Sequence, residues 1–396
     1  MRAPRALALC LAAASLTAAS LPGVNAAAVP GVNSTMAFST NATWPYSHNS
    51  GWALLPSGRI AVVFQASESV EGAASQVILL AASDDGGATF APARVIAGSG
   101  HASAWGPAAF ADGAVLRVFY AQAPLTHPTL LCGDIMHTSS ADGGLTWSVP
   151  ELMLARAAWG GGNKCSDNKP AQVGLRQWAL PFMSVAAGGA TTGLLAAAPG
   201  AGMAGPWAPL AGSIPTPPHF NTTDYLSEPA IARCSSGGGG GSSAPNALLA
   251  LLRNYELTWA ARSTDGGASW DAAAPTALTN PYSKVDLAVW PGGAGASGPP
   301  PGALLLAHNP VRNCTKPVYC PRTPLGVSWS PDCGASWSPP LLLEPTDVSP
   351  RGASYPTVGA CGRGRVCASY TLYREGGFAG IRFAAFDVGA LPPLEG

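Results

Sequence analysis

The sequence carries little charge for its length. Charged residues make up 11% of the 396 residues, and 21 Lys and Arg balance 21 Asp and Glu. An average soluble protein has about 25% charged residues. A neutral, charge-poor chain has no basic field to attract nucleic acid or a membrane surface, so we expect neither as a partner. If the protein binds an anion, a few placed arginines must hold it.

Metal-ligand spacings and long apolar runs are also missing. The sequence has no CxxC pair and no HxxxH cluster, so it implies neither a metal nor any other cofactor. Beyond the N-terminal segment, the most apolar stretch, 185–205, is broken by many glycines and by Pro199. A bilayer span needs roughly 20 apolar residues in a row. We therefore expect no membrane insertion.

The N-terminus has the features of a secretory signal. Arg2 and Arg5 precede an apolar run over 6–19, and Val24-Asn25-Ala26 fits a cleavage site, so we interpret residues 1–26 as a signal peptide. The run is too short for a membrane anchor. The sequence thus predicts a secreted protein or one in the secretory-pathway lumen. Four N-glycosylation sequons agree with this location: Asn33-Ser-Thr, Asn41-Ala-Thr, Asn221-Thr-Thr and Asn313-Cys-Thr.

Eight cysteines remain after the proposed signal, and an even number in a secreted chain favours disulfides. Sequence alone does not fix how they pair. Close spacing favours local pairs, which we expect in this order of strength: Cys314 with Cys320 and Cys361 with Cys367, then Cys132 with Cys165.

Short strands dominate the rest of the chain. Gly (48) and Pro (38) are abundant, which favours turns, and no stretch has a convincing apolar period of 3.6 residues. Short apolar or alternating runs end at Gly, Pro, Asn or Asp instead, and we read them as strands. Four examples are 59–64, 114–120, 247–252 and 303–307. The expected fold class is all-β.

An eight-residue pattern, S-x-D-x-G-x-[ST]-[WF], recurs four times. The copies span 83–90, 140–147, 263–270 and 330–337. Their starts lie 57, 123 and 67 residues apart, so a degenerate copy should lie in the long interval, where 200–207 keeps only the Gly and the Trp. The chemistry is that of a hairpin turn, in which Asp bonds backbone amides, Gly supplies positive φ and the aromatic ring packs beneath. The Asp residues are therefore structural and not catalytic.

This pattern resembles the Asp box of sialidases and related BNR-repeat proteins. The resemblance implies a six-bladed β-propeller, because about sixty residues fit one four-stranded blade with its loops. We divide the chain into the signal at 1–26, a lead-in segment at 27–45 and the propeller at 46–390. Asp boxes also occur in non-enzymatic propellers, so the site needs separate evidence.

The C-terminal half resembles the catalytic pattern of that family. In sialidases a Tyr nucleophile is activated by a Glu, because a carboxylate nucleophile would be repelled by the carboxylate of the substrate. Arginine forks hold that carboxylate. This resemblance implies that Tyr355 is the nucleophile, Glu228 the base, and Arg253 and Arg322 two clamp arginines, and their order and spacing relative to the boxes fit the family.

The N-terminal half departs from that pattern. His48 stands where the family has its first clamp arginine, and the segment expected to hold an acid Asp contains none. Glu71, or less strongly Glu68, is the candidate replacement. These departures resemble a plant and bacterial branch of BNR-repeat proteins, whose W-x-P and N-K-P segments are echoed at 105–107 and 168–170.

His48 could be a general base, a sugar ligand or a packed core histidine, and we favour a site role. Lys169 and Asp286 are further candidates for substrate contact.

Three functions follow from these assignments. The first is an exo-acting glycosidase that removes sialic acid or a related acidic sugar from an anionic glycan. The second is a uronate-directed hydrolase or lyase, with acid-base work by His48 and Tyr355. The third is a carbohydrate-binding propeller without catalysis.

Overall fold

The computed structural model describes residues 29–174, 176–186, 189–215, 226–234, 246–292, 298–311, 322–344, 352–362 and 364–394. The proposed signal, the pair Cys314 and Cys320, and the sequons at Asn221 and Asn313 lie outside these ranges. Almost every regular element within them is a β-strand, as the sequence predicts. None of the helices in the described part is long and apolar enough to cross a membrane.

The strands form six antiparallel sheets. Five are built from consecutive segments of the chain, and the sixth combines three strands near the C-terminus with the first strand. The first sheet contains β2 (Tyr46–Leu54), β3 (Ile60–Ser67), β4 (Val77–Ser83) and β5 (Arg94–Ala97). The second contains β6 (Ala104–Asp112), β7 (Val115–Gln122), β8 (Asp134–Ser140) and β9 (Glu151–Leu154). The third contains β10 (Asn163–Cys165), β11 (Ala171–Gly174), β12 (Gln177–Ala186), β13 (Gly189–Ala197) and β14 (Trp207–Ile214).

The remaining three sheets complete the ring. The fourth contains β15 (Ser227–Arg233), β16 (Leu248–Arg253), β17 (Leu257–Ser263) and β18 (Ala274–Thr279). The fifth contains β19 (Asp286–Val289), β20 (Leu304–His308), β21 (Leu325–Ser330) and β22 (Leu341–Glu344). The sixth contains β23 (Ala353–Ala360), β24 (Arg365–Arg374), β25 (Gly377–Asp387) and β1 (Val32–Ser39), and the 3-10 turn η1 (Val388–Ala390) follows.

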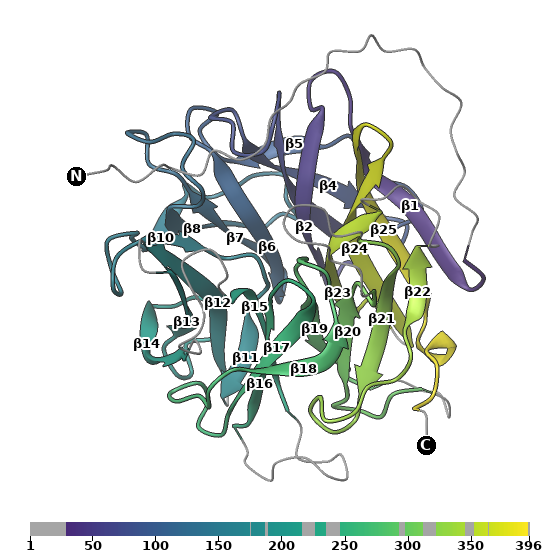
Figure 1. Ribbon diagram of the computed structural model, residues 1–396. Helices are drawn as coiled ribbons and strands as arrows, with labels where there is room; N and C mark the ends of the chain where they lie inside the picture. Colours follow the sequence, from purple (N-terminus) through teal and green to yellow (C-terminus); the bar gives the residue numbers. More distant parts are fainter. Residues whose placement is uncertain are drawn as a thin grey trace.

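The six sheets surround a common axis, so the predicted six-bladed propeller is confirmed (Figure 1). Strands β2, β6, β11, β15, β19 and β23 all face the axis, where they line one cavity. The ring closes in the sixth sheet, where β1 pairs with β25 from the other end of the chain. Part of the segment that the sequence sets apart as a lead-in, 27–45, thus forms the outer strand of a blade.

Apolar packing between neighbouring sheets explains why the strand sequences are nearly continuous apolar runs. In β3, Val62 and Phe64 pack against residues of β25, whereas Ala61 and Val63 pack against residues of β7. Side chains on a strand alternate between the two faces of its sheet. A blade with neighbours on both sides buries both faces, so its strands need apolar residues at successive positions.

The four copies of the repeated motif occupy equivalent turns, between the last two strands of the first, second, fourth and fifth sheets. In the first copy, the Asp85 carboxylate accepts bonds from the backbone N–H of Thr89 (2.9 Å) and its hydroxyl (2.6 Å). These bonds, the Thr89 hydroxyl first among them, lower the pKa of Asp85 to about 2. The degenerate copy at 200–207 lies in the same place, between β13 and β14. The structural role predicted for the motif is confirmed.

Three disulfides occur in the described residues. Cys132–Cys165 and Cys361–Cys367 confirm two predicted pairs. The third, Cys234–Cys333, joins the end of β15 to the Asp-box turn of the fifth sheet. These two cysteines are 99 residues apart, so spacing gave no sign of the pair.

Candidate active site

The same backbone irregularity recurs near the start of four axial strands. Asn49, Gly106, Glu228 and Tyr355 have positive φ values of 48°, 55°, 47° and 56°. Each lies where the register of its strand shifts against the neighbouring strand. Such bulges redirect side chains, and left-handed non-glycine residues are uncommon outside functional or strained positions. The fold therefore places several residues with a left-handed backbone conformation at one end of the axis.

Tyr355, Glu228 and Arg253 meet in a buried hydrogen-bonded group. The Tyr355 hydroxyl donates to Oε1 of Glu228 at 2.7 Å. Nη1 of Arg253 donates both to this carboxylate oxygen and to the Tyr355 hydroxyl. Burial raises the pKa of Tyr355 well above its usual value, although Arg253 opposes the rise. Tyr355 is therefore a neutral phenol with a carboxylate placed to take its proton.

A second guanidinium flanks the same phenol. Arg322 lies with Cζ 5.4 Å from the centre of the Tyr355 ring, and Arg253 with Cζ 5.7 Å from it. The backbone oxygen of Tyr282 accepts a bond from Arg322 Nη2 at 2.8 Å, and the Tyr282 ring lies 3.8 Å from Cζ of Arg253. The structure thus brings together the four residues that the C-terminal pattern singled out.

His48 lies against Tyr355 and is uncharged. Its ring centre is 4.2 Å from that of Tyr355. Burial, and after it the positive charge of Arg322, hold the pKa of His48 well below its usual value. Nδ1 lies 2.9 Å from the hydroxyl of Thr371, which already accepts a bond from the backbone N–H of Asn49. The Tyr373 hydroxyl is also 3.4 Å from Nδ1. Two hydroxyl groups are best matched when Nδ1 accepts a bond, so we assign the ring proton to Nε2. His48 then offers one neutral donor, without a partner among the described residues.

Glu71 belongs to the same site but remains open to solvent. Its carboxylate accepts a long bond from Gln65 at 3.4 Å. The surrounding protein raises its pKa, whereas Tyr46 and the charge of Arg322 oppose the rise. Because Glu71 is exposed, water reduces the size of this shift. Glu68, the weaker alternative, is also exposed, and no contact joins it to the site residues that the structure describes.

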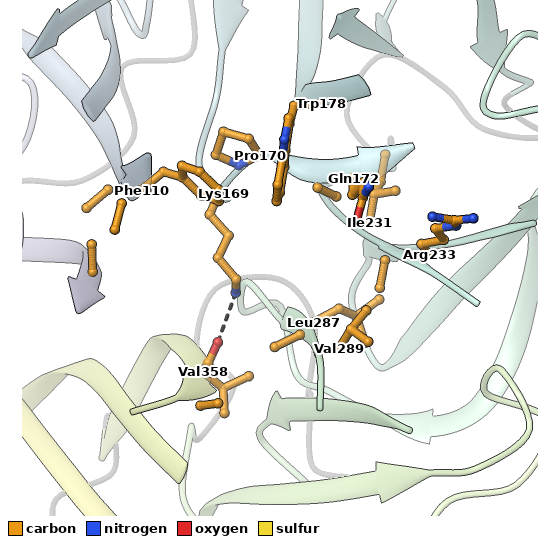
Figure 2. Close-up of a pocket in the computed structure, with 18 of the residues that line it drawn as sticks. Phe110, Lys169, Pro170, Gln172, Trp178, Ile231, Arg233, Leu287, Val289 and Val358 are labelled. Carbon is orange, nitrogen blue, oxygen red and sulfur yellow. Dashed lines mark hydrogen bonds between the residues drawn. The ribbon is translucent and has the colours of Figure 1, made fainter. Parts of the chain in front are cut away.

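The structure places Lys169 and Asp286 apart from these residues. The Lys169 amine pairs with the Asp286 carboxylate and donates to the backbone oxygen of Val358 at 2.9 Å. Asp286 also accepts the backbone N–H of Val358 at 2.8 Å. In Figure 2 the amine points into a cavity at the other end of the axis. The two side chains bond to each other and to the backbone of Val358 in β23, and neither contacts Tyr355 among the described interactions.

Comparison with known proteins agrees with this architecture. Residues 242–367 match the family described as BNR repeat-like domain. A Hadza microbial sialidase superposes with a TM-score of 0.66 over 87% of this chain, at 15% identity, and 66% of its own length is covered. A Trypanosoma rangeli sialidase mutant superposes with a TM-score of 0.67 over 91% of this chain, at 14% identity, with 59% of its length covered.

The chain has the sialidase fold. A protein of unknown function from Dyadobacter fermentans shares this fold over its whole length, with 91% of this chain covered, a TM-score of 0.67 and 15% identity. The chain therefore spans less than two thirds of the length of the two sialidases and all of this third protein. No curated protein matches the sequence.

One carboxyl group in this sialidase-fold site was missed by the sequence analysis. Oδ1 of Asp167 accepts a bond from the side-chain amide of Asn49 at 2.7 Å. A Cβ atom on Gly106 would lie 2.6 Å from this oxygen, so the glycine leaves the space that Asp167 occupies. Burial, and then the charge of Glu228, raise the pKa of Asp167 to about 7, although Lys284 opposes the rise. Two features of the sequence pointed to this carboxyl group: Asp167 directly precedes the N-K-P segment, and the W-x-P segment contains Gly106.

Lys284 is a buried basic residue next to Asp167. It is fully buried, and its amine donates to the backbone oxygen of Asp167 at 3.0 Å and to the Thr357 hydroxyl at 3.3 Å. Burial lowers its pKa, whereas the charges of Asp286 and Asp167 oppose this. Acidic and basic groups therefore continue along the axis of the sialidase fold, from Glu228 towards the pair of Lys169 and Asp286.

Proposed function

We propose that this chain is a secreted sialidase-like glycoside hydrolase that acts on terminal sialic acid or a related acidic sugar. The observation that carries the proposal is the bonded pair of Tyr355 and Glu228 with two guanidinium groups beside it. A substrate with a carboxylate on its anomeric carbon repels a carboxylate nucleophile, and a neutral phenol avoids this repulsion. The three disulfides support an oxidising compartment and hence secretion.

The first chemical step follows from these bonds. The Tyr355 oxygen attacks the anomeric carbon while its proton passes to Oε1 of Glu228. The bond to the leaving oxygen breaks, and Glu71 supplies the proton that this oxygen needs. The upward direction of its pKa shift favours the protonated form that this role needs, and its exposure suits a group beside the departing sugar. The sugar is then joined to Tyr355.

The second step reverses these proton transfers. Water attacks the anomeric carbon and gives a proton to Glu71 while the bond to Tyr355 breaks. The phenolate recovers its proton from Glu228, so both groups return to their initial states. In both steps Arg253, Arg322 and the Nε2 donor of His48 hold the carboxylate of the sugar.

The decisive experiment is release of sialic acid from a fluorogenic aryl sialoside by the purified protein. Tyr355→Phe should lower kcat by at least about 100-fold because the nucleophilic oxygen is gone. Tyr120→Phe is the matched control, since Tyr120 is an equally buried tyrosine in the packing between the first and second sheets. Equal activity of Tyr355→Phe and wild type would refute the mechanism. Unsaturated product from a polyuronate, without release of sialic acid, would favour the uronate-directed alternative.

A carbohydrate-binding propeller without catalysis is the second candidate. One observation favours it: a neutral His48 stands at the position of the third clamp cation, so the set of residues departs from the catalytic pattern. Glu71→Gln distinguishes the two. A hydrolase should lose activity on alkyl glycosides and keep more on aryl glycosides, whose leaving groups need less help from an acid. A binding protein should show no turnover of either substrate and unchanged affinity in the variant.

A further inference from the structure

A cavity opens on the axis at the end opposite Tyr355. Its volume is about 690 Å³, within the range of roughly 300–1,000 Å³ that is typical of small-molecule sites. The later residues of the six axial strands or the segments beside them form its wall, whereas the early residues of the same strands carry Tyr355 and Glu228. Figure 2 shows side chains from several blades converging on this space. The cavity is separate from the site described above.

The wall combines small and aromatic side chains. Seven of the lining residues are alanine, which leaves the space open. Phe110 and Trp178 lie edge to face, 4.6 Å between ring centres, and both are half-buried where they border the cavity. Val289 adds an apolar side chain that is 42% exposed. Partly exposed rings and aliphatic groups around a concave space favour an apolar ligand body with a flat face.

The charged side chains that line the cavity are basic. Among the described residues that line it, Lys169 and Arg233 are basic and none is acidic. The Lys169 amine uses two of its three protons, for Asp286 and for the backbone of Val358. Figure 2 shows this amine directed into the space between the aromatic and aliphatic walls. Its third proton is therefore placed to meet an acceptor on a ligand.

Neighbouring carboxyl groups offset the positive charges at the floor of the cavity. Asp286 pairs with Lys169, and the charges of Asp286 and Asp167 act on Lys284. Neither carboxyl group lines the cavity, whereas Lys169 does. A ligand there meets an N–H donor and no carboxylate among the described lining residues, so an anionic group is favoured over a cationic one.

We propose that this cavity binds a small amphipathic anion, an aromatic ring that carries one carboxylate or sulfonate. The ring packs between Trp178 and Phe110 on one side and the alanine-rich wall on the other. The anionic group accepts the third proton of Lys169. This site is independent of the proposed glycosidase activity, and its occupant need not be a sugar.

The test uses the full chain and the dye anilinonaphthalene sulfonate, which joins aromatic rings to one sulfonate. Saturable binding with a blue-shifted emission is expected. Ala171→Trp and Ala360→Trp fill the cavity from the third and sixth sheets, and each should weaken binding at least about tenfold. Leu152→Trp, on the outer strand β9 where Leu152 is 58% exposed, adds the same side chain elsewhere and should leave affinity unchanged.

A second pair of variants tests the anionic contact. Lys169→Met with Asp286→Asn removes the ion pair as a unit and should weaken binding several-fold. Lys169→Arg keeps the positive charge and should retain most of the affinity. Equal dye binding by wild type, Ala171→Trp and Ala360→Trp would overturn the proposal, as would binding that Tyr355→Phe abolishes, since the dye would then occupy the other site.

Discussion

One of the two carboxylate oxygens of Glu228 has no hydrogen-bond partner among the described residues. Oε1 accepts bonds from Tyr355 and Arg253, whereas Oε2 is buried and has no partner among the described residues. A buried acceptor without a partner costs free energy unless a ligand or water fills the place. The Nε2 donor of His48 is a similar opening in the hydrogen-bond network. Both groups fit a site that is completed by its substrate.

Asp167 should make stability depend on pH. Its pKa of about 7 is above the value near 3.8 expected after unfolding, so the folded protein binds its proton more tightly. Ionisation is therefore a cost to folding above pH 7, and this cost fades as the pH falls towards 4. Asp167→Asn should be more stable than wild type at pH 8 by roughly 2 kcal/mol, since partial exposure moderates the shift.

Urea unfolding at several pH values measures that difference. The stability gap between Asp167→Asn and wild type should close between pH 7 and pH 4. A constant gap over this range would contradict the raised pKa, since a variant that only lost a hydrogen bond would show no such trend.

Gly106→Ala tests the space that Asp167 needs. The new methyl group would lie 2.6 Å from Oδ1 of Asp167 and 2.5 Å from the backbone oxygen of Ser166, at a φ of 55°. Gly113 has a nearly identical φ of 58° with nothing within 4 Å of the same position, so Gly113→Ala isolates the backbone strain. Gly113→Ala should cost about 1 kcal/mol of unfolding free energy, and Gly106→Ala clearly more. Equal costs by urea unfolding would show that the site adapts freely.

At the scale of elements, the Asp-box turn is held by hydrogen bonds between residues that are close in sequence. Asp332 bonds the backbone and hydroxyl of Ser336 and also accepts from Ser330, all within one turn. Such a pattern is legible in the sequence because every partner lies within four residues. The four strands named in advance were predicted from short apolar runs, which are local too, and β16 and β20 begin within one residue of the expected runs.

Removing one box carboxylate should therefore affect stability and leave the site intact. Asp332→Ala loses three hydrogen bonds and should lower the unfolding free energy by roughly 1–2 kcal/mol. Its affinity for an acidic sugar or for the dye should match wild type, because the turn lies between β21 and β22 and contributes none of the described residues that form the Tyr355 site or line the axial cavity. Thermal unfolding and dye titration on the same sample measure both effects. Altered affinity would contradict a purely structural role.

Contacts across the axis were only partly accessible from the sequence. Tyr355, Glu228, Arg253 and Arg322 were found because each has a fixed place relative to a box. Asp167 was missed, and the direction of Lys169 towards the opposite end of the axis was not foreseen, because both depend on how different blades face each other. Which partner a buried charge meets is settled by three-dimensional packing, and no local pattern encodes it.

At the scale of the whole molecule, disulfides tie blades together to different extents. Cys234–Cys333 spans 99 residues and links the fourth sheet to the fifth, whereas Cys361–Cys367 spans 6 residues within the sixth sheet. A crosslink that closes a longer loop removes more conformational freedom from the unfolded chain. The long link should therefore matter more to stability.

Paired serine variants test this. Cys234→Ser with Cys333→Ser should cost about 5 kcal/mol of unfolding free energy, and Cys361→Ser with Cys367→Ser about 2 kcal/mol, on the loop-entropy account. Calorimetric unfolding of both variants gives the comparison. The reverse order would show that local packing around the short link outweighs chain entropy.

The pairing of β1 with β25 sets the order of events when the protein is made. One of the earliest strands to leave the ribosome finds its partner only after residue 387 has been added, so its edge stays unpaired during nearly all of synthesis. His48 and Tyr355 lie on the two blades that meet where the ring closes. A nascent chain that stalls before its last strand would thus hold five formed blades and an unfinished site.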